Sequence, residues 1–421
     1  MTPEGWRSAT YGQVMAETEH RADEATELPV LSVTKTRGPM LASERFGKVM
    51  HGRDLKKYRV AHRGSVVADP MLLWDGSIGL QTVVDAGLVS PDYRVYQPAK
   101  DVDPRFLGYL VRSPMMLPHY QGGARGTNVR RNRIARSDFL AIPVALPPLP
   151  EQRNIAAILC SVDQAVHAAQ TVIDQLQVVK RAMMAELLAR GLPGRHKRFK
   201  QTELGEVPEE WQVVRMDTLA DPKGMVGGPF GSDLTAKDYV KEPGVPVIRG
   251  GNVSMGRFTE EDYVFVSREK ASALAKNSAT LGDLVMTQRG ASLGEVTLIP
   301  PGSQYDFYII SQTMMRMTPD VSKVSTRFIL HYTCSPAAQK WLQAHQVATG
   351  QPHLNLGIYR AMPALVPGWE EQAAIADAMD RIDETIDANT PQFEQLKRVK
   401  SALTAVLLTG EVRVKPDEEA A

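Results

Sequence analysis

A segment of 43 residues occurs twice in this chain, and the repeat constrains the fold more strongly than any other feature. Residues 148–190 align with residues 368–410 at a constant offset of 220, and 14 of the 43 positions are identical. Apolar residues recur in both copies in alternating steps of three and four, which is the pattern of a coiled-coil seam. The pattern predicts two long helices whose apolar seam positions are Leu159, Val162, Val166, Ile173, Leu176, Met183 and Leu187 in the first copy and Met379, Ile382, Ile386, Phe393, Leu396, Leu403 and Leu407 in the second.

Prolines and glycines mark the ends of the predicted helices. Prolines precede each copy, acidic residues occupy each first turn, and Gly191 and Gly410 stand where the helices should stop. Pro391 lies inside the second copy, and because it lacks a backbone N–H we expect it to kink or restart that helix. Two ordinary core helices are the alternative interpretation, but a seam kept in register twice favours a coiled coil.

The distribution of charge predicts how the two helices pair. The net charge is +1, yet residues 151–200 carry +4 and residues 368–421 carry −6. Because opposite charges attract, we expect one intramolecular, antiparallel coiled coil rather than two separate dimer seams. Lys180, Lys400 and Asn389 occupy polar seam positions, which can fix the register of such a coil.

The remaining sequence forms two distantly related blocks. Both open on a Pro-Glu-x-Trp motif, which ends at Trp6 and at Trp211, and Phe106 precedes a Ser-Pro pair at the same spacing as Phe328. Short β-type runs, Gly/Pro turns and occasional helices alternate in both blocks, so we predict an α+β fold class with two domains separated by the two long helices. The predicted boundaries are 1–146 for the first domain, 147–200 for a central spacer helix, 201–366 for the second domain, 367–412 for a distal spacer helix and 413–421 for an acidic tail.

Polar, glycine-rich loops in both blocks carry residue types that contact phosphates and base edges. Five arginines lie between residues 125 and 136, and no acidic residue lies between Asp103 and Asp138. This favours binding to a phosphate backbone, although a solvated basic loop would have the same composition. The candidate DNA-binding residues are Trp74, Ser77, Arg125, Thr127, Asn128, Arg130, Arg131 and Arg133 in the first block and Ser232, Arg249, Asn252, Gln288, Arg289, Ser292, Gln351, His353 and Asn355 in the second.

Several enzyme classes lack their motifs in this sequence. It contains no methyltransferase tetrad, no glycine fingerprint for S-adenosylmethionine, no convincing nuclease constellation and no P-loop. Nine scattered histidines and the two distant cysteines, Cys160 and Cys334, provide no metal-ligand spacing. We therefore expect no catalytic residues, no metal and no cofactor. The absence of an 18-residue apolar run and of a signal peptide leads us to expect no membrane span and a cytoplasmic location.

These motifs together resemble the specificity (S) subunit of type I restriction–modification systems, the HsdS family. The resemblance is strongest at the two spacers, where Leu149-Pro-Glu-Gln152 and Trp369-Glu-Glu-Gln372 begin the repeated segments. It continues through residues 199–211 and 228–234, and it covers nearly the whole chain.

The resemblance implies a non-catalytic subunit that reads a bipartite target in double-stranded DNA through two target-recognition domains. It further implies that two methyltransferase (M) subunits dock on the spacer helices and that motor–nuclease (R) subunits join them in the full complex. The alternatives are a self-contained restriction and methylation enzyme, which the missing motifs disfavour, and a coiled-coil protein scaffold without DNA readout, which would not need arginine-rich loops.

Overall fold

The computed structural model describes residues 2–23, 27–47, 55–125, 133–241, 244–348 and 350–414. It divides into two compact units: unit 1 comprises Met1–Gln170 and Pro391–Ala421, and unit 2 comprises Thr171–Thr390. The division passes through both long helices. Each unit therefore contains one sequence block together with part of each repeated segment.

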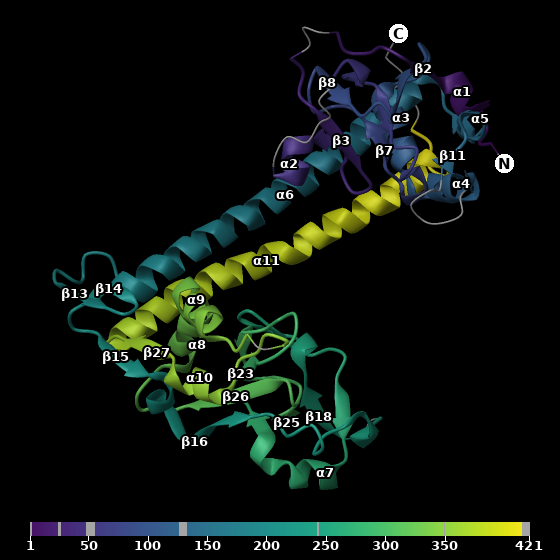
Figure 1. Cartoon of the computed structure of the whole chain (residues 1–421). Coiled ribbons are helices and arrows are strands. Elements are labelled where there is room, and N and C mark those ends of the chain that lie inside the picture. Colours follow the sequence, from purple (N-terminus) through teal and green to yellow (C-terminus); the bar gives the residue numbers. More distant parts are fainter. Residues whose placement is uncertain are drawn as a thin grey trace. The chain divides into compact units, whose positions relative to one another are not determined.

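The repeated segments form the helices α6 (Leu149–Arg190) and α11 (Trp369–Leu408), which confirms the two predicted long helices (Figure 1). Gly191, with φ of +79°, and Gly410, with φ of +72°, follow the helices in the left-handed conformation that favours glycine. The helices are shorter than the predicted spacers 147–200 and 367–412. The reason after α6 is that the chain turns at Gly191 and then enters strand β13 (Phe199–Thr202).

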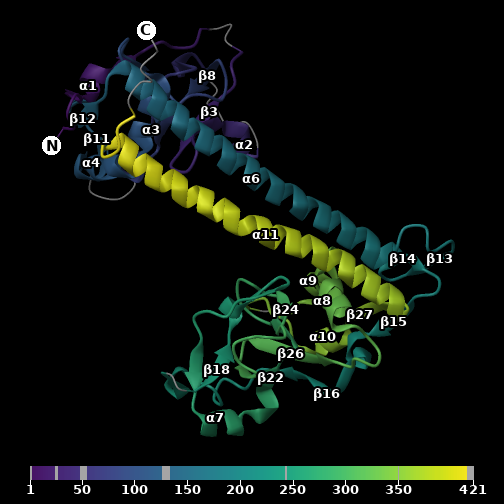
Figure 2. The same cartoon turned by 180° about the vertical axis from the view of Figure 1, so that it is seen from behind.

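The two helices run antiparallel within each unit, and both views show them side by side (Figures 1 and 2). In unit 2, Lys180 forms an ion pair with Asp383, and in unit 1 the Nζ atom of Lys400 lies 2.6 Å from Oδ1 of Asp163. The two lysines are 220 residues apart, as are the two aspartates, so the repeat places equivalent ion pairs in the two units. The predicted antiparallel coiled coil is confirmed, and the ion pairs at its polar seam positions define its register.

The predicted seam is the covered face of both helices. All of the predicted apolar seam residues are buried or half-buried, and none is exposed. Valines outside the seam, among them Val172, Val178 and Val179, are exposed. The difference in exposure confirms the heptad assignment.

Helix α11 continues through Pro391, so the predicted restart at this residue was wrong. Proline removes a single backbone N–H from the helical ladder. The preceding turn carries additional hydrogen bonds, because the Thr390 hydroxyl donates to the Ile386 carbonyl at 2.8 Å and the Asn389 amide donates to the Thr385 carbonyl at 2.8 Å. The helix is uninterrupted on the N-terminal side of the proline, where these two bonds lie.

By length and composition, α6 is the one described helix that is long and apolar enough to cross a membrane. This is weak support for a span, since core helices of soluble proteins have the same composition.

The sequence block of unit 1 folds into short strands and helices. Its elements are β1 (Arg7–Thr10), α1 (Tyr11–Val14), β2 (Met15–Thr18), β3 (Leu31–Thr34), β4 (Gly38–Leu41), α2 (Ala42–Phe46), η1 (Leu55–Lys57), β5 (Arg59–His62), β6 (Val66–Ala68), η2 (Leu73–Asp75), β7 (Ile78–Leu80), β8 (Ala86–Val89), β9 (Arg94–Pro98), α3 (Pro104–Arg112), η3 (Pro114–Met116), α4 (Leu117–Gly122), β10 (Ala124–Arg125), β11 (Arg133–Ile134), α5 (Arg136–Leu140) and β12 (Pro143–Leu146).

The block of unit 2 also consists of short strands and helices, and it contains a longer central insertion. After β13 its elements are β14 (Gly205–Pro208), β15 (Gln212–Arg215), η5 (Met216–Leu219), β16 (Ala220–Gly227), η6 (Ala236–Asp238), β17 (Tyr239–Val240), β18 (Val245–Ile248), η7 (Gly250–Asn252), β19 (Val253–Ser254), β20 (Arg257–Phe258), β21 (Val264–Val266), α7 (Arg268–Ala273), η8 (Ala275–Asn277), β22 (Ser278–Thr280), β23 (Leu284–Thr287), β24 (Val296–Leu298), β25 (Phe307–Ile310), β26 (Met314–Pro319), α8 (Thr326–Cys334), α9 (Pro336–His345), α10 (Leu356–Ala361) and β27 (Pro363–Val366).

The two blocks share one sheet topology. Unit 1 contains an antiparallel sheet in the order β2-β9-β6-β7, and unit 2 contains an antiparallel sheet in the corresponding order β16-β26-β23-β24. The strand before each long helix pairs with the strand that directly follows the Pro-Glu-x-Trp motif of its block, as β12 with β1 and β27 with β15. Unit 2 adds a five-stranded sheet, β17-β21-β18-β25-β22, where unit 1 has the pairs β3-β4 and β5-β8. The predicted α+β class and the predicted kinship of the blocks are confirmed.

Helices α3 and α8 occupy equivalent places after these sheets. Asp103 caps α3 by accepting hydrogen bonds from the backbone N–H groups of Arg105 and Phe106, and Ser325 caps α8 by accepting one from Phe328. Phe106 and Phe328 are fully buried in the cores of their units. The matched Phe-to-Ser-Pro spacing in the sequence therefore marks one helix present in both blocks.

Candidate nucleic-acid interface

A buried glutamate at the start of each long helix holds the opening of each block. In unit 1 the Nε1–H of Trp6 donates to Glu151 at 3.2 Å, and Arg413 donates to both carboxylate oxygens of Glu151 at 2.7 and 2.8 Å. In unit 2 the Nε1–H of Trp211 donates to Glu371 at 3.1 Å. The Pro-Glu-x-Trp motif and the repeated helix start, which are far apart in sequence, thus meet in both units.

The glutamine that follows each glutamate binds the N-cap of the equivalent helix, α3 or α8, in its block. The Oε1 atom of Gln152 accepts a hydrogen bond from the backbone N–H of Asp103 at 2.8 Å, and that of Gln372 accepts one from Ser325 at 2.7 Å. Asp103 and Ser325 are the N-caps of α3 and α8. Each Glu-Gln pair therefore fixes one block on its long helix, a role that the sequence analysis did not assign to these residues.

The two glutamates have different partners besides their tryptophans. Burial raises the pKa of the Glu151 carboxyl, but the hydrogen bonds and charge of Arg413 and the bond from Trp6 outweigh burial and lower that pKa below its usual value. Glu371 instead lies 2.8 Å from His196 Nε2 and 3.7 Å from Arg195 Nε. The carboxylate at the start of α6 is thus held ionised by its arginine.

Five segments of unit 2 converge on one surface, which we name the loop surface: residues 228–233, 249–252, 288–292, 311–313 and 351–355. Gln288 is central to it, because its backbone N–H donates to the Thr313 carbonyl at 2.8 Å and its side chain donates to the Gln312 carbonyl at 2.6 Å. Its own carbonyl accepts from the Leu354 N–H at 3.0 Å. Gly250 faces Ser292, and Arg289 pairs with His353 through an isolated β-bridge.

The loop surface gathers most of the candidate residues predicted in the second block. Ser232, Arg289, Gln351 and Asn355 are exposed, and Arg249, Gln288, Ser292 and His353 are half-buried. Four of the segments follow or precede strands of two different sheets, and residues 351–355 lie between α9 and α10, so the convergence depends on the tertiary fold rather than on sequence distance. Arginine, glutamine and serine side chains on one accessible surface are the groups that donate to phosphates and base edges.

Some candidate residues have structural roles that the sequence analysis did not anticipate. Asn252 is 2% exposed, and its side chain accepts from the Arg249 N–H and donates to the carbonyls of Thr259 and Glu261. Ser77 is 3% exposed within the core of unit 1. Asn355 is exposed, yet its Oδ1 caps α10 by accepting from the Ile358 N–H at 2.9 Å. We therefore leave Asn252 and Ser77 out of the proposed contact set, because buried side chains cannot reach a ligand.

One candidate residue of unit 1, Trp74, lies at a place equivalent to part of the loop surface. Trp74 lies in η2, between β6 and β7, as residues 288–292 lie between β23 and β24. Strands β10 and β11 pair through Arg125 and Arg133, and β11 contacts η2. Arg133 is exposed, and only the backbone of Arg125 is described. Thr127, Asn128, Arg130 and Arg131 lie outside the described residues.

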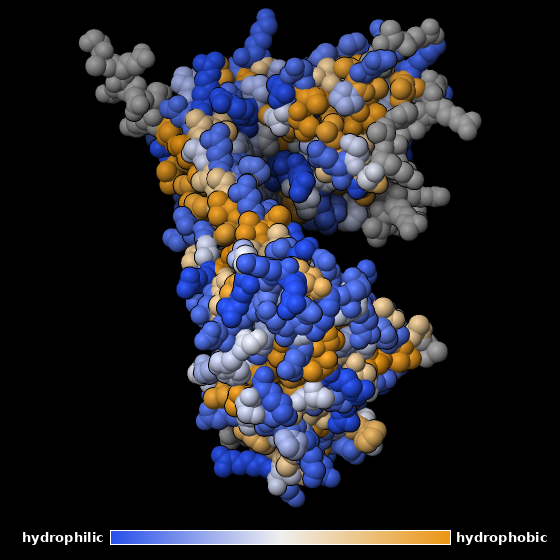
Figure 3. Space-filling model, turned by 90° about the vertical axis from the view of Figure 1, so that its left-hand side faces the viewer, coloured by the Kyte–Doolittle hydropathy of each residue, from blue (hydrophilic) through white to orange (hydrophobic). Residues whose placement is uncertain are grey.

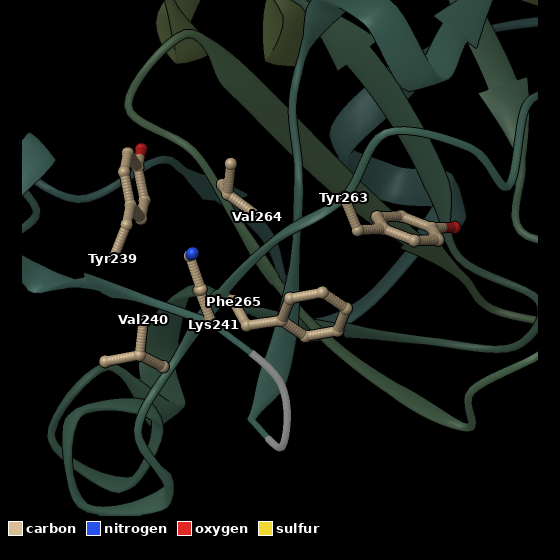
Figure 4. Close-up of a pocket in the computed structure, with 6 residues that line it drawn as sticks. All are labelled: Tyr239, Val240, Lys241, Tyr263, Val264 and Phe265. Carbon is tan, nitrogen blue, oxygen red and sulfur yellow. The ribbon is translucent and has the colours of Figure 1, made fainter.

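A shallow hollow of about 540 Å³ lies beside the five-stranded sheet of unit 2 (Figure 4). Its lining comes from β17 and β21 and the residues next to them, namely Tyr239, Val240, Lys241, Tyr263, Val264 and Phe265. The Tyr263 ring lies 6.4 Å from the Phe265 ring, measured between the ring centroids. The hollow offers aromatic and aliphatic surface with one amine and no carboxylate, so it lacks an acid–base pair. In the part of the chain that the structure describes, no group of three or more His, Cys, Asp or Glu side chains is placed to hold a metal ion.

Comparison with known proteins finds similarity to type I restriction–modification specificity subunits. A family model described as the type I restriction modification DNA specificity domain matches residues 208–398. The chain is 27% identical over 354 residues to the type I restriction enzyme MjaVIII specificity subunit of Methanocaldococcus jannaschii, covering 82% of this chain and 80% of that protein. It is 26% identical over 317 residues to the putative MjaX specificity subunit of the same organism, covering 75% and 69% of the two chains.

A solved structure has a similar fold. The crystal structure of the type I restriction–modification system S subunit from M. genitalium matches 97% of this chain and 99% of its own length with a TM-score of 0.57. At 13% sequence identity, this likeness concerns the fold alone.

Proposed function

We propose that this chain, which is similar to type I restriction–modification specificity subunits, is the non-catalytic subunit that reads a bipartite target in double-stranded DNA. Each unit would read one half-site through its own loops. Two methyltransferase subunits would dock on the coiled coil and modify the DNA that the chain selects, and motor–nuclease subunits would join them for restriction.

The duplicated geometry carries this proposal. Both units place candidate residues between corresponding strands of corresponding sheets, Trp74 in unit 1 and residues 288–292 in unit 2. Both units hold their block on a long helix by the same tryptophan–glutamate and glutamine–backbone bonds. The two units share one architecture but differ in their loop residues. Such a pair is suited to two half-sites with different bases.

The exposed faces of the long helices support docking of protein partners. Hydrophobic surface lies between hydrophilic patches on these helices (Figure 3). Val178 of α6 is 56% exposed, and the repeat-related residues Val179 and Val399 are 47% and 41% exposed. Apolar side chains that are exposed at equivalent places on two helices suit two copies of one partner.

The first prediction concerns catalysis. The purified chain, incubated with DNA and S-adenosylmethionine, is expected to transfer no methyl groups, because its sequence lacks the cofactor-binding motifs. With its methyltransferase partner it is expected to direct methylation to one bipartite sequence, which sequencing of the modified bases would define. Methyl incorporation by the chain alone would support a self-contained enzyme. Partner binding without any selectivity for DNA sequence would support a protein scaffold.

The second prediction concerns the arginine-rich stretch of unit 1. Replacing Arg130, Arg131 and Arg133 by alanine is expected to weaken DNA binding and flatten its dependence on salt, by about 0.9 in the log–log slope for each lost phosphate contact. Binding titrations at several salt concentrations would measure the slope. The matched control replaces Arg7, Arg63 and Arg105, exposed arginines of the same unit that are paired with Asp101, Asp85 and Asp103. An equal loss of slope in both triple variants would show that the effect is general charge and not a phosphate site.

A further inference from the structure

Phe230 is the most exposed large hydrophobic residue of the described chain, with 82% of its surface accessible. It belongs to the loop surface, in the segment that follows β16. Leaving an aromatic side chain in water forgoes the favourable free energy that its burial would supply. An exposed phenylalanine within an otherwise polar surface therefore suggests a partner with an apolar group.

The backbone around Phe230 is held in place, so the ring is presented by a fixed turn. The Asp233 N–H donates to the Phe230 carbonyl at 2.9 Å and closes the turn, and the Gly228 N–H donates to the Met314 carbonyl at 2.8 Å. The side chain of Asn277 donates to the Gly227 carbonyl at 2.7 Å. Leu234, which is 1% exposed, anchors the other side of the turn in a core.

Glycines bring this turn close to the rest of the loop surface. A Cβ atom at Gly228 would overlap the Ser311 carbonyl oxygen, so only glycine permits this approach. A Cβ atom at Gly231 would lie 3.2 Å from Oε1 of Gln312. Gln312 also accepts, through its carbonyl, the hydrogen bond from Gln288. Phe230 thus stands beside amide groups of the kind that read base edges, and not on a separate face.

We propose that Phe230 is a specificity-determining residue of unit 2 that packs against the 5-methyl group of a thymine in the major groove. This inference rests on the proposed function, since it requires that the loop surface binds DNA. The major-groove edges of the bases present hydrogen-bonding groups and one apolar group, the thymine methyl. An aromatic ring beside glutamine side chains can therefore read an A·T pair by shape and hydrophobicity where its neighbours read by hydrogen bonds.

The test replaces thymine by uracil, which removes only the methyl group. The target is first defined by the methylation that the wild-type chain directs with its methyltransferase partner. Each thymine of the half-site read by unit 2 is then replaced in turn, and the affinity of that complex is measured. We expect one position at which uracil weakens wild-type binding about four-fold, the factor that corresponds to one buried methyl group. The Phe230→Ala complex should bind the natural target more weakly and should not distinguish thymine from uracil at that position.

Two variants control for stability and for residue type. Phe230→Leu keeps an apolar side chain and should retain part of the discrimination. Phe307→Ala changes a 39%-exposed phenylalanine at the opposite end of β25 from Ser311, and it should leave the discrimination intact. Both alanine variants should unfold near the wild-type temperature, because they change exposed side chains. Phe230→Ala should leave the salt dependence unchanged, since a phenyl ring neutralises no phosphate.

The outcomes separate this inference from the proposed function. If the wild-type complex binds one bipartite target and Phe230→Ala still discriminates thymine from uracil as the wild type does, the inference is wrong and the proposed function stands. A half-site in which no thymine methyl matters would overturn it as well. Increased fluorescence of 2-aminopurine in that half-site on binding, lost in Phe230→Ala, would mean that the ring unstacks bases instead of contacting a methyl group. Absence of any sequence-selective binding by the wild-type complex would overturn the proposed function itself.

Discussion

Lengthening both long helices by one heptad is expected to widen the gap between the two half-sites of the methylated target without changing their bases. Seven residues add about 10.5 Å of helix, the length of about three base pairs of B-DNA. The gap should therefore grow by up to about three base pairs, the largest value applying if the coiled coil runs along the duplex. The readout is the motif methylated by the chain with its methyltransferase partner.

The register of unit 2 shows where the two insertions must be placed to remain opposite each other. The pair of Lys180 and Asp383 puts Ile173, seven residues before the lysine, level with Thr390, seven residues after the aspartate. A copy of residues 166–172 inserted after Val172 and a copy of residues 384–390 inserted after Thr390 preserve the heptad phase. The matched control carries the first insertion alone. This change shifts one helix against the other and should reduce assembly.

An unchanged gap in a folded and active double-insertion chain would mean that the coiled coil is not the spacer. Altered bases within either half-site would mean that the helices contribute to base recognition, because no loop residue differs between the two chains. Three base pairs also turn one half-site by about 100° around the duplex, since B-DNA has about 10.5 base pairs per turn. We therefore expect the wider motif to be methylated more slowly than the natural one.

Replacing Glu371 by leucine is expected to destabilise unit 2 by about 3–5 kcal/mol, because it removes one side of a buried network. Trp211, the backbone N–H of Leu192 and His196 would each lose an acceptor that lies 2.8–3.1 Å away. Glu370→Leu is the matched control, since Glu370 is exposed on the same helical turn. Its effect is expected to be within about 0.5 kcal/mol.

Hydrogen exchange measured by mass spectrometry would localise the effect of Glu371→Leu. Amide protection should fall across the described residues of 205–366 and remain close to wild type across the block of unit 1, whose anchor is Glu151. Glu371→Gln keeps one acceptor oxygen and should lie between the wild type and the leucine variant. Equal protection in Glu371→Leu and Glu370→Leu would show that the buried bonds contribute little to holding the block on its helix.

The long helices and the kinship of the two blocks were predictable from sequence because their signals are local and repeated. Heptad spacing, the glycines at 191 and 410 and the matched Phe-to-Ser-Pro segments each specify backbone structure within a few turns. The predicted restart at Pro391 was wrong, because the loss of one backbone hydrogen bond does not decide whether a 40-residue helix continues. A local rule was outweighed by the helix on both sides of it.

The residue types of the candidate site could be predicted from the sequence. Which individual residues lie on it could be predicted only in part. The sequence analysis selected Gln288, Arg289, Ser292, Gln351 and His353 from glycine-rich loops, and the structure brings them together on the loop surface. It also selected Ser77 and Asn252, which are buried, and it did not single out Phe230. Glycines and polar residues make a loop recognisable, but burial depends on what packs over it from elsewhere in the chain.

The sequence by itself therefore determined the secondary structure of the coiled coil, the duplication of the blocks and the chemistry of their loops, because these follow from periodicity and composition. The tertiary structure decided which side chains meet. The pairing of Glu151 with Trp6 and of Glu371 with Trp211 joins residues 145 and 160 positions apart. The loop surface likewise exists only because the strand orders of two sheets bring their loops to one place. Such contacts depend on the path of the whole chain, which no local pattern encodes.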